Sequence, residues 1–363
     1  MNKWKWSIEL CVFVLLMGCN PVEQDLSRIE YAPELLVLEV PPDWPSMPIP
    51  SDNPLTQEGV ALGRMLFYDP ILSLDSTQSC ASCHLQSLAF TDAQAQSKGV
   101  LGLKGQRSAP SLANVGYYYQ GLFWDGRVRD LETQSLHPVR DKKELASNWS
   151  LVLDRIQEHP QYPIAFRKAF NIKQREAIDS LMMAKALAQF QRTLLSFNAK
   201  FDQMNRGELE FTEAERRGWA MFFDAKEELP HAECSHCHTD PLFTNLEYQN
   251  NGIQELSAAG NYRDPGKALA SGNPFDSGKF KVPTLRNIAL TAPYMHRGQL
   301  SNLDEVLEHY ISGGHYGENV SANVRKLALS ERDKNDLITF LYTLTDSSFI
   351  ENPNFGNPFK NAE

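Results

Sequence analysis

The sequence predicts a mainly α-helical protein with two similar domains, and three observations support this fold class. The chain has 363 residues, which is enough for two domains that each bury a core. Apolar residues recur at helical spacing in two long segments, and a short cysteine motif occurs twice with similar flanking residues. The predicted fold class is therefore all-α, with two domains related by internal duplication.

The first helical segment is predicted between Arg175 and Arg206. Its apolar residues follow one another at spacings of three and four, so they share one helix face that packs in a core: Met183, Leu187, Phe190, Leu194, Phe197 and Phe201. A matching last helix is predicted to start at Ser330, an N-cap residue with Asp333 as the third helical residue. Its apolar face consists of Leu337, Phe340, Leu341 and Leu344. Residues 245–280 lack periodicity and are rich in Gly, Asn, Asp and Ser, which indicates a long loop.

The repeated motif reads C-x-x-C-H in both copies, Cys80-Ala-Ser-Cys83-His84 and Cys234-Ser-His-Cys237-His238. The flanking residues correspond as well: Gly63-Arg-Met-Leu-Phe67 with Gly218-Trp-Ala-Met-Phe222, and Phe90-Thr91 with Phe243-Thr244. A repeat of this length indicates duplicated domains rather than a solenoid. Gly207-Glu-Leu-Glu210 marks the expected boundary, which divides the chain into an N-terminal domain, a C-terminal domain and a tail: 55–206, 207–350 and 351–363.

The C-x-x-C-H motif is the attachment signature of c-type haem. Two thiols on one helical turn can each bond a haem vinyl group, and the adjacent His84 or His238 then reaches the iron as the proximal ligand. A redox dithiol or a four-cysteine zinc site is the alternative, but a zinc site would leave both histidines unexplained. The sequence therefore predicts two covalently bound haem c groups.

The N-terminus has the features of an export signal. Lys3 and Lys5 precede an apolar run, Ile8–Met17, that is too short to span a bilayer as a helix. The run ends at Cys19 in a pattern that resembles a lipobox, so lipidation of Cys19 is expected, with a plain secretory signal as the alternative. The predicted segments are a signal peptide and a Pro-rich, acidic tether: 1–18 and 19–54.

This N-terminus predicts a periplasmic location with a lipid anchor in the outer membrane and no other membrane contact. The formal net charge of −10 argues against nucleic acid as a partner, because phosphates repel an acidic surface. The same charge permits steering of a basic protein partner, although charge alone does not identify one.

Several ordered motifs around the two haem signatures resemble the dihaem cytochrome c peroxidase family, which includes MauG. The resemblance extends from about Leu55 to Thr345. Its motifs are Leu62-Gly-Arg-Met-Leu-Phe67, Cys80-Ala-Ser-Cys-His84, Arg107-Ser-Ala-Pro110, Phe123-Trp-Asp-Gly-Arg127, Leu131-Glu-Thr-Gln134, Val282-Pro-Thr-Leu-Arg-Asn287 and Leu290-Thr-Ala-Pro-Tyr-Met-His296.

The resemblance implies a division of labour between two cytochrome c-like domains. Peroxide is split at the N-terminal haem, and electrons arrive through the C-terminal haem. Trp124 would bridge the haems, while Gln134 and Glu144 would face the open side of the first haem. A carboxylate with a raised pKa can move a proton between the peroxide oxygens, and an amide can orient the peroxide. A solvated helix face for Glu144 and a core position for Trp124 are the structural alternatives.

Further ligands follow from the same resemblance. Arg127 and Arg286 could pair with haem propionates, or they could form surface salt bridges instead. Family members hold a calcium ion between the haems, and its carbonyl ligands would correspond to Thr291 and Pro293. The usual side-chain ligand there is Asn, and Ser108 occupies that position here, where calcium could accept its hydroxyl.

Two departures from the family pattern concern the haem irons. Many family peroxidases close the first haem with a distal histidine, but this chain has no histidine between His84 and His137. We therefore expect the first haem to be open. At the second haem, Tyr310 occupies the position where peroxidases offer Met and MauG-like members offer Tyr. Tyr310 is the expected distal ligand, with Met295 and His309 as the competing candidates.

Three functions follow. The first is a peroxidase that reduces hydrogen peroxide to water with electrons from a small cytochrome c or cupredoxin. The second is a MauG-like enzyme that uses peroxide to oxidise aromatic residues of a partner protein. The third is a dihaem cytochrome that only carries electrons and needs neither Gln134 nor Glu144. The open first haem and Tyr310 favour the second mechanism, but they do not identify its partner.

Overall fold

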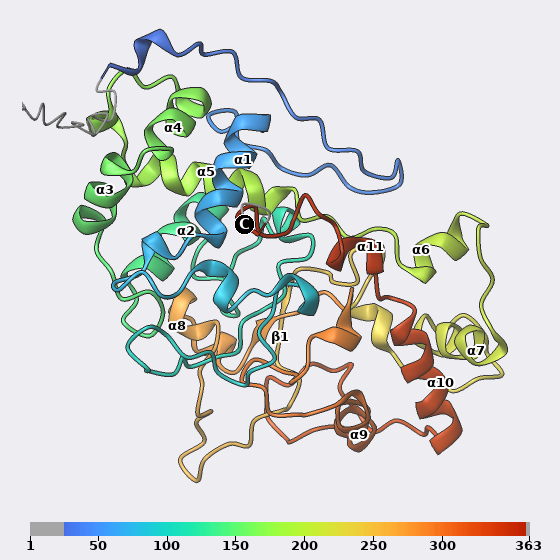
Figure 1. The fold of residues 1–363 in the computed structure, drawn as a ribbon. Helices are drawn as coiled ribbons and strands as arrows, with labels where there is room; N and C mark the ends of the chain where they lie inside the picture. The colour runs from blue at the N-terminus through green and yellow to red at the C-terminus, as the bar shows by residue number, and fades with distance from the viewer. Residues whose placement is uncertain (1–24, 361–363) are drawn as a thin grey trace, which may run out of the picture.

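The structure is a computed structural model that describes residues 25–360. It is mostly helical, as predicted from the sequence (Figure 1). The longer helices are α1 (Gln57–Tyr68), α2 (Leu131–Arg140), α3 (Trp149–Glu158), α4 (Tyr162–Phe170), α5 (Ser180–Arg192), α6 (Lys200–Asn205), α7 (Glu213–Phe222), α9 (Leu303–Ser312) and α10 (Glu331–Tyr342). Short elements complete the fold: α8 (Ala268–Ser271), α11 (Ser347–Ile350) and an antiparallel pair of strands, β1 (Tyr248–Gln249) and β2 (Phe280–Lys281).

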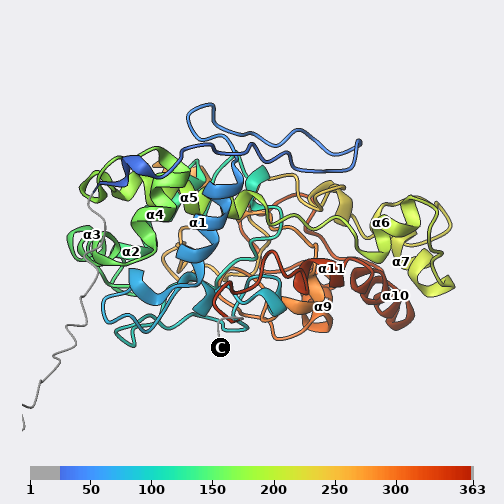
Figure 2. The ribbon, with the colours of Figure 1, turned by 45° about the horizontal axis from the view of Figure 1, so that its top comes forward.

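The described residues contain two separate hydrophobic clusters. The larger cluster gathers the buried faces of α1 to α5, and the smaller one lies between α6, α7, α9 and α10. In Figures 1 and 2, α3 and α4 lie at one end of the molecule, while α7 and α10 lie at the other. Long stretches of irregular chain fill the region between the two groups of helices.

Each cluster is organised around two helices that cross at a glycine. Gly63 on α1 faces α5, where an added Cβ would lie 1.9 Å from the Ala186 carbonyl oxygen. Gly218 on α7 faces α10, where an added Cβ would lie 2.0 Å from the Asp336 carbonyl oxygen. Only glycine allows the backbones to approach this closely, so the two helix pairs meet in the same way.

The prediction of one continuous helix between residues 175 and 206 is wrong. The apolar stripe is real, but α5 ends at Arg192 and α6 begins at Lys200. Side chains from elsewhere bind the intervening backbone: Asn114 donates to the Ser196 carbonyl and accepts from its N–H, and Asp346 accepts from the Asn198 N–H. These bonds replace the helical ones, so the chain changes direction without leaving polar groups unpaired.

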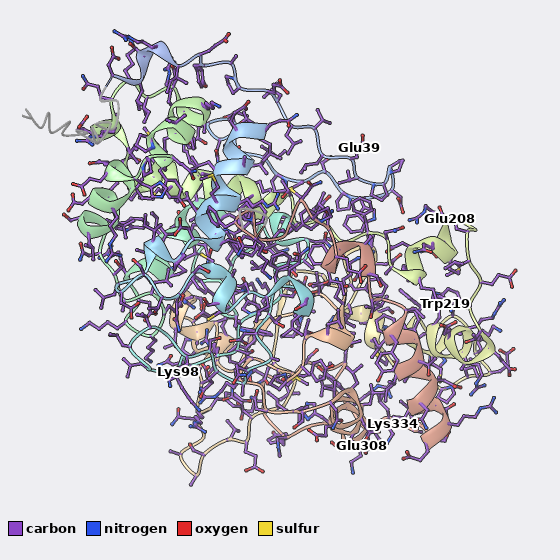
Figure 3. All side chains as sticks on the ribbon, viewed as in Figure 1. Glu39, Lys98, Glu208, Trp219, Glu308 and Lys334 are labelled. Atoms are coloured by element: carbon purple, nitrogen blue, oxygen red, sulfur yellow. The ribbon has the colours of Figure 1, made fainter. Side chains whose placement is uncertain are left out.

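The prediction for the last helix is confirmed. Ser330 accepts from the Asp333 N–H, and the Asp333 carboxylate accepts from the Ser330 N–H, which forms a capping box at the start of α10. Lys334 on α10 reaches across to Glu308 on α9, with 2.6 Å between Nζ and Oε1 (Figure 3). Residues 245–280 are mostly irregular, as expected, although β1 and α8 lie within them.

The chain segments before and after the helical clusters pack against the larger cluster. In the segment predicted to be a tether, Leu26 and Trp44 are buried in the larger cluster. The C-terminal segment returns to the same cluster, where the Arg64 guanidinium donates to the carbonyl oxygens of Pro353 and Gly356. Both segments therefore brace the N-terminal half. The predicted signal peptide and Cys19 lie outside the described residues. Between residues 25 and 360, no helix has the length and apolar character needed to cross a membrane.

Candidate active site

The two C-x-x-C-H motifs adopt the same local structure. Cys80 begins a short 3-10 turn, and the backbone N–H of His84 donates to the Cys80 carbonyl at 3.0 Å. Cys234 begins the second turn, and the N–H of His238 donates to its carbonyl at 2.9 Å. Both thiols of each motif therefore lie on one turn, with the histidine directly after it.

Each histidine ring is oriented by a backbone carbonyl. His84 Nδ1 lies 2.7 Å from the Phe90 carbonyl oxygen, and His238 Nδ1 lies 3.1 Å from that of Phe243. A carbonyl that holds Nδ1–H leaves Nε2 with a free lone pair, which is the tautomer that binds a metal. Burial lowers the pKa of His84, and it lowers the pKa of His238 to about 4, so both rings stay neutral. This donor set fits haem iron.

A cavity of about 610 Å³ opens beside the first motif. Cys80, Cys83 and His84 line it, and apolar residues from α1, α2 and α5 form much of the wall. In the described part of the chain, His84 is the only histidine that lines the cavity. The volume and the apolar wall suit a porphyrin held by the two thiols.

Glu144 lies at one side of this cavity, where it also lines a second, more open pocket of about 530 Å³. The Val100 N–H donates to the Glu144 carbonyl at 2.9 Å, which fixes the backbone of this turn. Burial, together with the nearby negative charge of Asp141, raises the pKa of the Glu144 carboxyl to about 7, while Arg127 opposes the shift. The carboxyl can therefore both accept and release a proton near neutral pH.

Gln134 and Trp124 line the same cavity as Glu144, so the structure brings the three predicted side chains together. Gln134 comes from α2, which begins after its N-cap Asp130. Trp124 is held by two hydrogen bonds: its indole Nε1 donates to the Ser108 carbonyl at 2.9 Å, and its own carbonyl accepts from the Lys281 N–H at 2.8 Å.

Hydrogen bonds lead from Trp124 to the surroundings of the second motif. The Ser108 carbonyl accepts from the Trp124 indole, and the Ser108 hydroxyl donates to the Met295 carbonyl at 3.1 Å. The Asn251 amide donates to the Met295 sulfur at 3.2 Å and to the Tyr310 hydroxyl at 3.3 Å. Trp124, Ser108, Met295, Asn251 and Tyr310 therefore form one continuous connection between the two regions.

The three candidates for the second distal ligand all lie around Asn251. His309 is already engaged, because its Nε2 lies 2.9 Å from the Asn251 carbonyl oxygen. The Met295 sulfur and the Tyr310 hydroxyl both contact the Asn251 side chain. Burial raises the pKa of Tyr310 to about 12, and the hydrogen bond from the Asn251 side chain opposes the shift.

The structure gives the two predicted propionate partners different surroundings. Arg127 lines the first cavity, contacts Asp125 at 3.0 Å and lies over the Phe123 ring. Arg286 is fully buried and forms a two-pronged ion pair with Asp202, with both distances at 2.8 Å. Its Nε donates to the Pro241 carbonyl, so each of the three guanidinium nitrogens has a protein partner, while the second N–H of each terminal nitrogen is left for a propionate.

The side chains at the expected calcium position form hydrogen bonds with other protein groups. The Ser108 hydroxyl donates to Met295, and the Thr291 hydroxyl donates to the Ile288 carbonyl at 3.2 Å. The two carboxylates near Ser108 both bind the Arg107 guanidinium: Asp125 at 2.6 Å and Asp264 at 2.8 Å. A calcium ion here would therefore be held by the Ser108 hydroxyl and by backbone carbonyl oxygens, which are oxygen ligands that calcium accepts.

Two residues of the site, one buried and one half-buried, had no signal in the sequence. Lys281 lines the first cavity, donates to the Gly121 carbonyl at 3.2 Å and lies 4.2 Å from the centre of the Tyr118 ring. Burial lowers the pKa of Lys281 to about 7. Asn251 joins Met295 to Tyr310, but it lies in a segment that reads only as a loop. Such contacts depend on chain segments that are distant in sequence.

Comparison with known proteins supports the same conclusion as the geometry. A family model described as di-haem cytochrome c peroxidase matches residues 57–210. The methylamine utilization protein MauG of Methylorubrum extorquens is 37% identical over 300 residues, covering 82% of this chain and 81% of that protein. The cytochrome-c peroxidase IdrP1 of Denitromonas iodatirespirans is 33% identical over 331 residues, covering 83% of this chain and 85% of that protein.

A solved structure extends the comparison to the fold. It is described as a MauG-like protein associated with microbial copper homeostasis, and it is 35% identical to this chain with a TM-score of 0.82. The match covers 90% of this chain and 100% of that chain. The chain therefore belongs to the dihaem cytochrome c peroxidase and MauG family, and it is an oxidoreductase that uses peroxide.

Proposed function

We propose that this protein is a MauG-like enzyme, which uses hydrogen peroxide to oxidise aromatic residues of a partner protein. The observation that carries the proposal is the contrast between the two motif regions. A cavity that no second histidine lines adjoins His84, whereas in the other half the Tyr310 hydroxyl and the Met295 sulfur meet at the Asn251 amide. In the overall reaction the partner loses two electrons and is oxidised. Hydrogen peroxide takes up these two electrons and two protons and is reduced to two water molecules.

The haem assignments follow from the matched geometry. Cys80 and Cys83 would bind one haem with His84 on its iron, and the second motif would bind the other in the same way. The matched helix crossings at Gly63 and Gly218 support two duplicated domains, with the boundary near residue 207. When bound, the haem irons supply the redox chemistry that couples peroxide reduction to oxidation of the partner.

Proton handling at the first site is assigned to Glu144. Its carboxylate would accept a proton from one peroxide oxygen and return it to the oxygen that leaves as water. The Gln134 amide, which lines the same cavity, would orient the peroxide. The more open pocket on the other side of Glu144, lined also by Arg127, Arg140 and His137, provides a route for peroxide from solvent.

The second site is assigned a different role, because Tyr310 and Met295 meet there at the Asn251 amide. The Tyr310 oxygen would bind the second iron, and the Asn251 amide would hold that oxygen in place. A phenolate oxygen stabilises oxidised iron, whereas a thioether from Met295 would raise the potential. Trp124 and the hydrogen bonds beyond it would couple the two sites.

A cytochrome c peroxidase is the second candidate function, and relatives with that name favour it. In that case a small cytochrome c or cupredoxin would supply the electrons. Export to the periplasm, the lipid on Cys19 and calcium between Ser108, Thr291 and Pro293 belong to the proposal for either function. The third possibility, a carrier without peroxide chemistry, leaves the position of Glu144 at the cavity unexplained.

The experiment that separates the two enzymes uses the fully oxidised, haem-loaded protein without prior reduction. Peroxide is added with and without excess reduced cytochrome c, and both the haem spectrum and peroxide consumption are followed. The MauG-like proposal predicts a long-lived oxidised spectrum and negligible turnover with the cytochrome. Rapid turnover from the first cycle would instead identify a peroxidase that is always open.

A further inference from the structure

A cluster of potential metal ligands lies outside the haem cavities, next to the second C-x-x-C-H motif. Asp224 follows α7, Glu233 directly precedes Cys234, and His236 lies between the two cysteines. One ligand atom from each of the three side chains lies within 4.8 Å of the other two. Among residues 25–360, no other group of three or more His, Cys, Asp and Glu side chains meets this criterion.

The spacing of these atoms suits a small divalent ion. His236 Nε2 lies 3.3 Å from Glu233 Oε2 and 3.8 Å from Asp224 Oδ2. A tetrahedral ion that is about 2.0–2.1 Å from each ligand keeps its ligand atoms roughly 3.3 Å apart. Both imidazole–carboxylate distances are therefore within about 0.5 Å of the spacing around such an ion, and the two carboxylate ligand atoms lie within 4.8 Å of each other.

Neighbouring groups orient both carboxylates toward His236. The other oxygen of Asp224, Oδ1, accepts from the Ala232 N–H at 3.1 Å, which leaves Oδ2 facing the imidazole. The Arg325 guanidinium binds Glu233 Oε1, which leaves Oε2 facing the imidazole. The two carboxylate side chains are only 16% and 19% exposed, whereas His236 is 48% exposed, so an ion can reach a partly preorganised site.

We propose that Asp224, Glu233 and His236 form a binding site for a divalent transition metal of the zinc or copper(II) type. One imidazole nitrogen with two carboxylate oxygens is a donor set that these ions accept, whereas calcium prefers oxygen ligands alone. His231, whose Nδ1 lies 3.6 Å from Asp224 Oδ1, is a nearby second imidazole at the same carboxylate. The site is separate from the proposed haem ligands and from the expected calcium position.

The test is zinc binding to the tag-free, haem-loaded protein after chelator treatment, in buffer with saturating calcium. Isothermal titration calorimetry with Zn²⁺ measures the affinity, and EPR with Cu²⁺ reports whether nitrogen binds the ion. The variants are His236→Gln and Glu233→Gln. His315→Gln is the matched control, because His315 is 47% exposed and pairs with the single carboxylate of Glu255 at 3.4 Å.

The expected result is one saturable zinc site in the wild type and in His315→Gln. Each of the other two variants should bind zinc at least about tenfold more weakly, since even loss of an indirect ligand partner costs that much. The copper EPR spectrum should lose its nitrogen coupling in His236→Gln. Haem spectra verify that both variants are folded, and Glu233→Gln leaves the haem motif unchanged. Absence of saturable zinc binding in the wild type, or equal binding in His236→Gln and His315→Gln, would overturn the proposal.

Discussion

The two halves of the molecule share a scaffold but differ around the motif histidines. In both halves, two helices cross at a glycine, a C-x-x-C-H turn follows, and a phenylalanine carbonyl orients the histidine ring. Beyond these features the halves diverge: a cavity adjoins His84, whereas Tyr310 and Met295 converge beside the second motif. The comparison teaches that helix packing supplies two equivalent positions for the motif histidines, while the loops around them bring different side chains to each position.

The difference has a physical origin in what each half places opposite its histidine. In the N-terminal half, α2 and the turn that follows it bring Gln134 and Glu144 to the cavity. In the C-terminal half, α9 brings Tyr310 toward Asn251, whose amide also binds Met295. One half therefore offers groups that handle protons, and the other offers groups that can ligate iron.

The largest effect is expected from Glu144→Gln, which tests the special role of the first cavity. Removal of a positioned acid–base group should slow the reaction with peroxide by about 10²–10⁴-fold. Stopped-flow mixing of the oxidised, haem-loaded protein with peroxide measures the rate constant. Glu158→Gln, at an exposed position on α3, is the control and should react like the wild type. Equal rates for Glu144→Gln and wild type would exclude the proposed proton transfer.

A smaller effect is expected from Gly63→Ala and Gly218→Ala, which test whether the two scaffolds are equivalent. The added methyl group would collide with a backbone carbonyl in either half, so each variant should lose about 1–3 kcal/mol of the free energy of unfolding. Urea denaturation of the haem-loaded protein measures the loss. Gly105→Ala is the matched control, because its Cβ would meet no heavy atom closer than 3.5 Å. A large loss in only one half would contradict the equivalence.

The smallest effect is expected from lowering the pH by one unit below neutrality. Burial raises the pKa of Glu144 to about 7, and the ionised form is the one that accepts the proton. The rate constant for the reaction with peroxide should therefore rise roughly tenfold per pH unit up to about pH 7 and then level off. Stopped-flow measurements of this rate constant at pH values below and above 7 give its pH dependence. A rate that is independent of pH in the wild type would remove Glu144 as the base.

Much of the fold could be predicted from the sequence because local patterns determine it. The repeated motif marks both histidine turns, and the Ser330–Asp333 capping box marks the start of α10. The break between α5 and α6 could not be predicted from its periodicity. It depends on Asn114 and Asp346, which are distant in sequence and bind the backbone that would otherwise continue the helix.

The candidate site, too, could be predicted only in part from the sequence. The resemblance to the family identified Trp124, Gln134 and Glu144, and the structure places all three at one cavity. Asn251 and Lys281 carry no local signal, because their importance comes only from the residues they meet in space. The buried ion pair between Arg286 and Asp202 could not be predicted for the same reason, because the two residues are far apart in the sequence.

The central claim is that the first haem site is open while Tyr310 closes the second. EPR spectroscopy of the fully oxidised, haem-loaded protein tests it directly, in the wild type and in Tyr310→His. The account predicts one high-spin ferric signal and one low-spin ferric signal in the wild type, and only the low-spin signal should change in the variant. Two low-spin signals in the wild type, or a low-spin signal that is identical in Tyr310→His, would contradict the account.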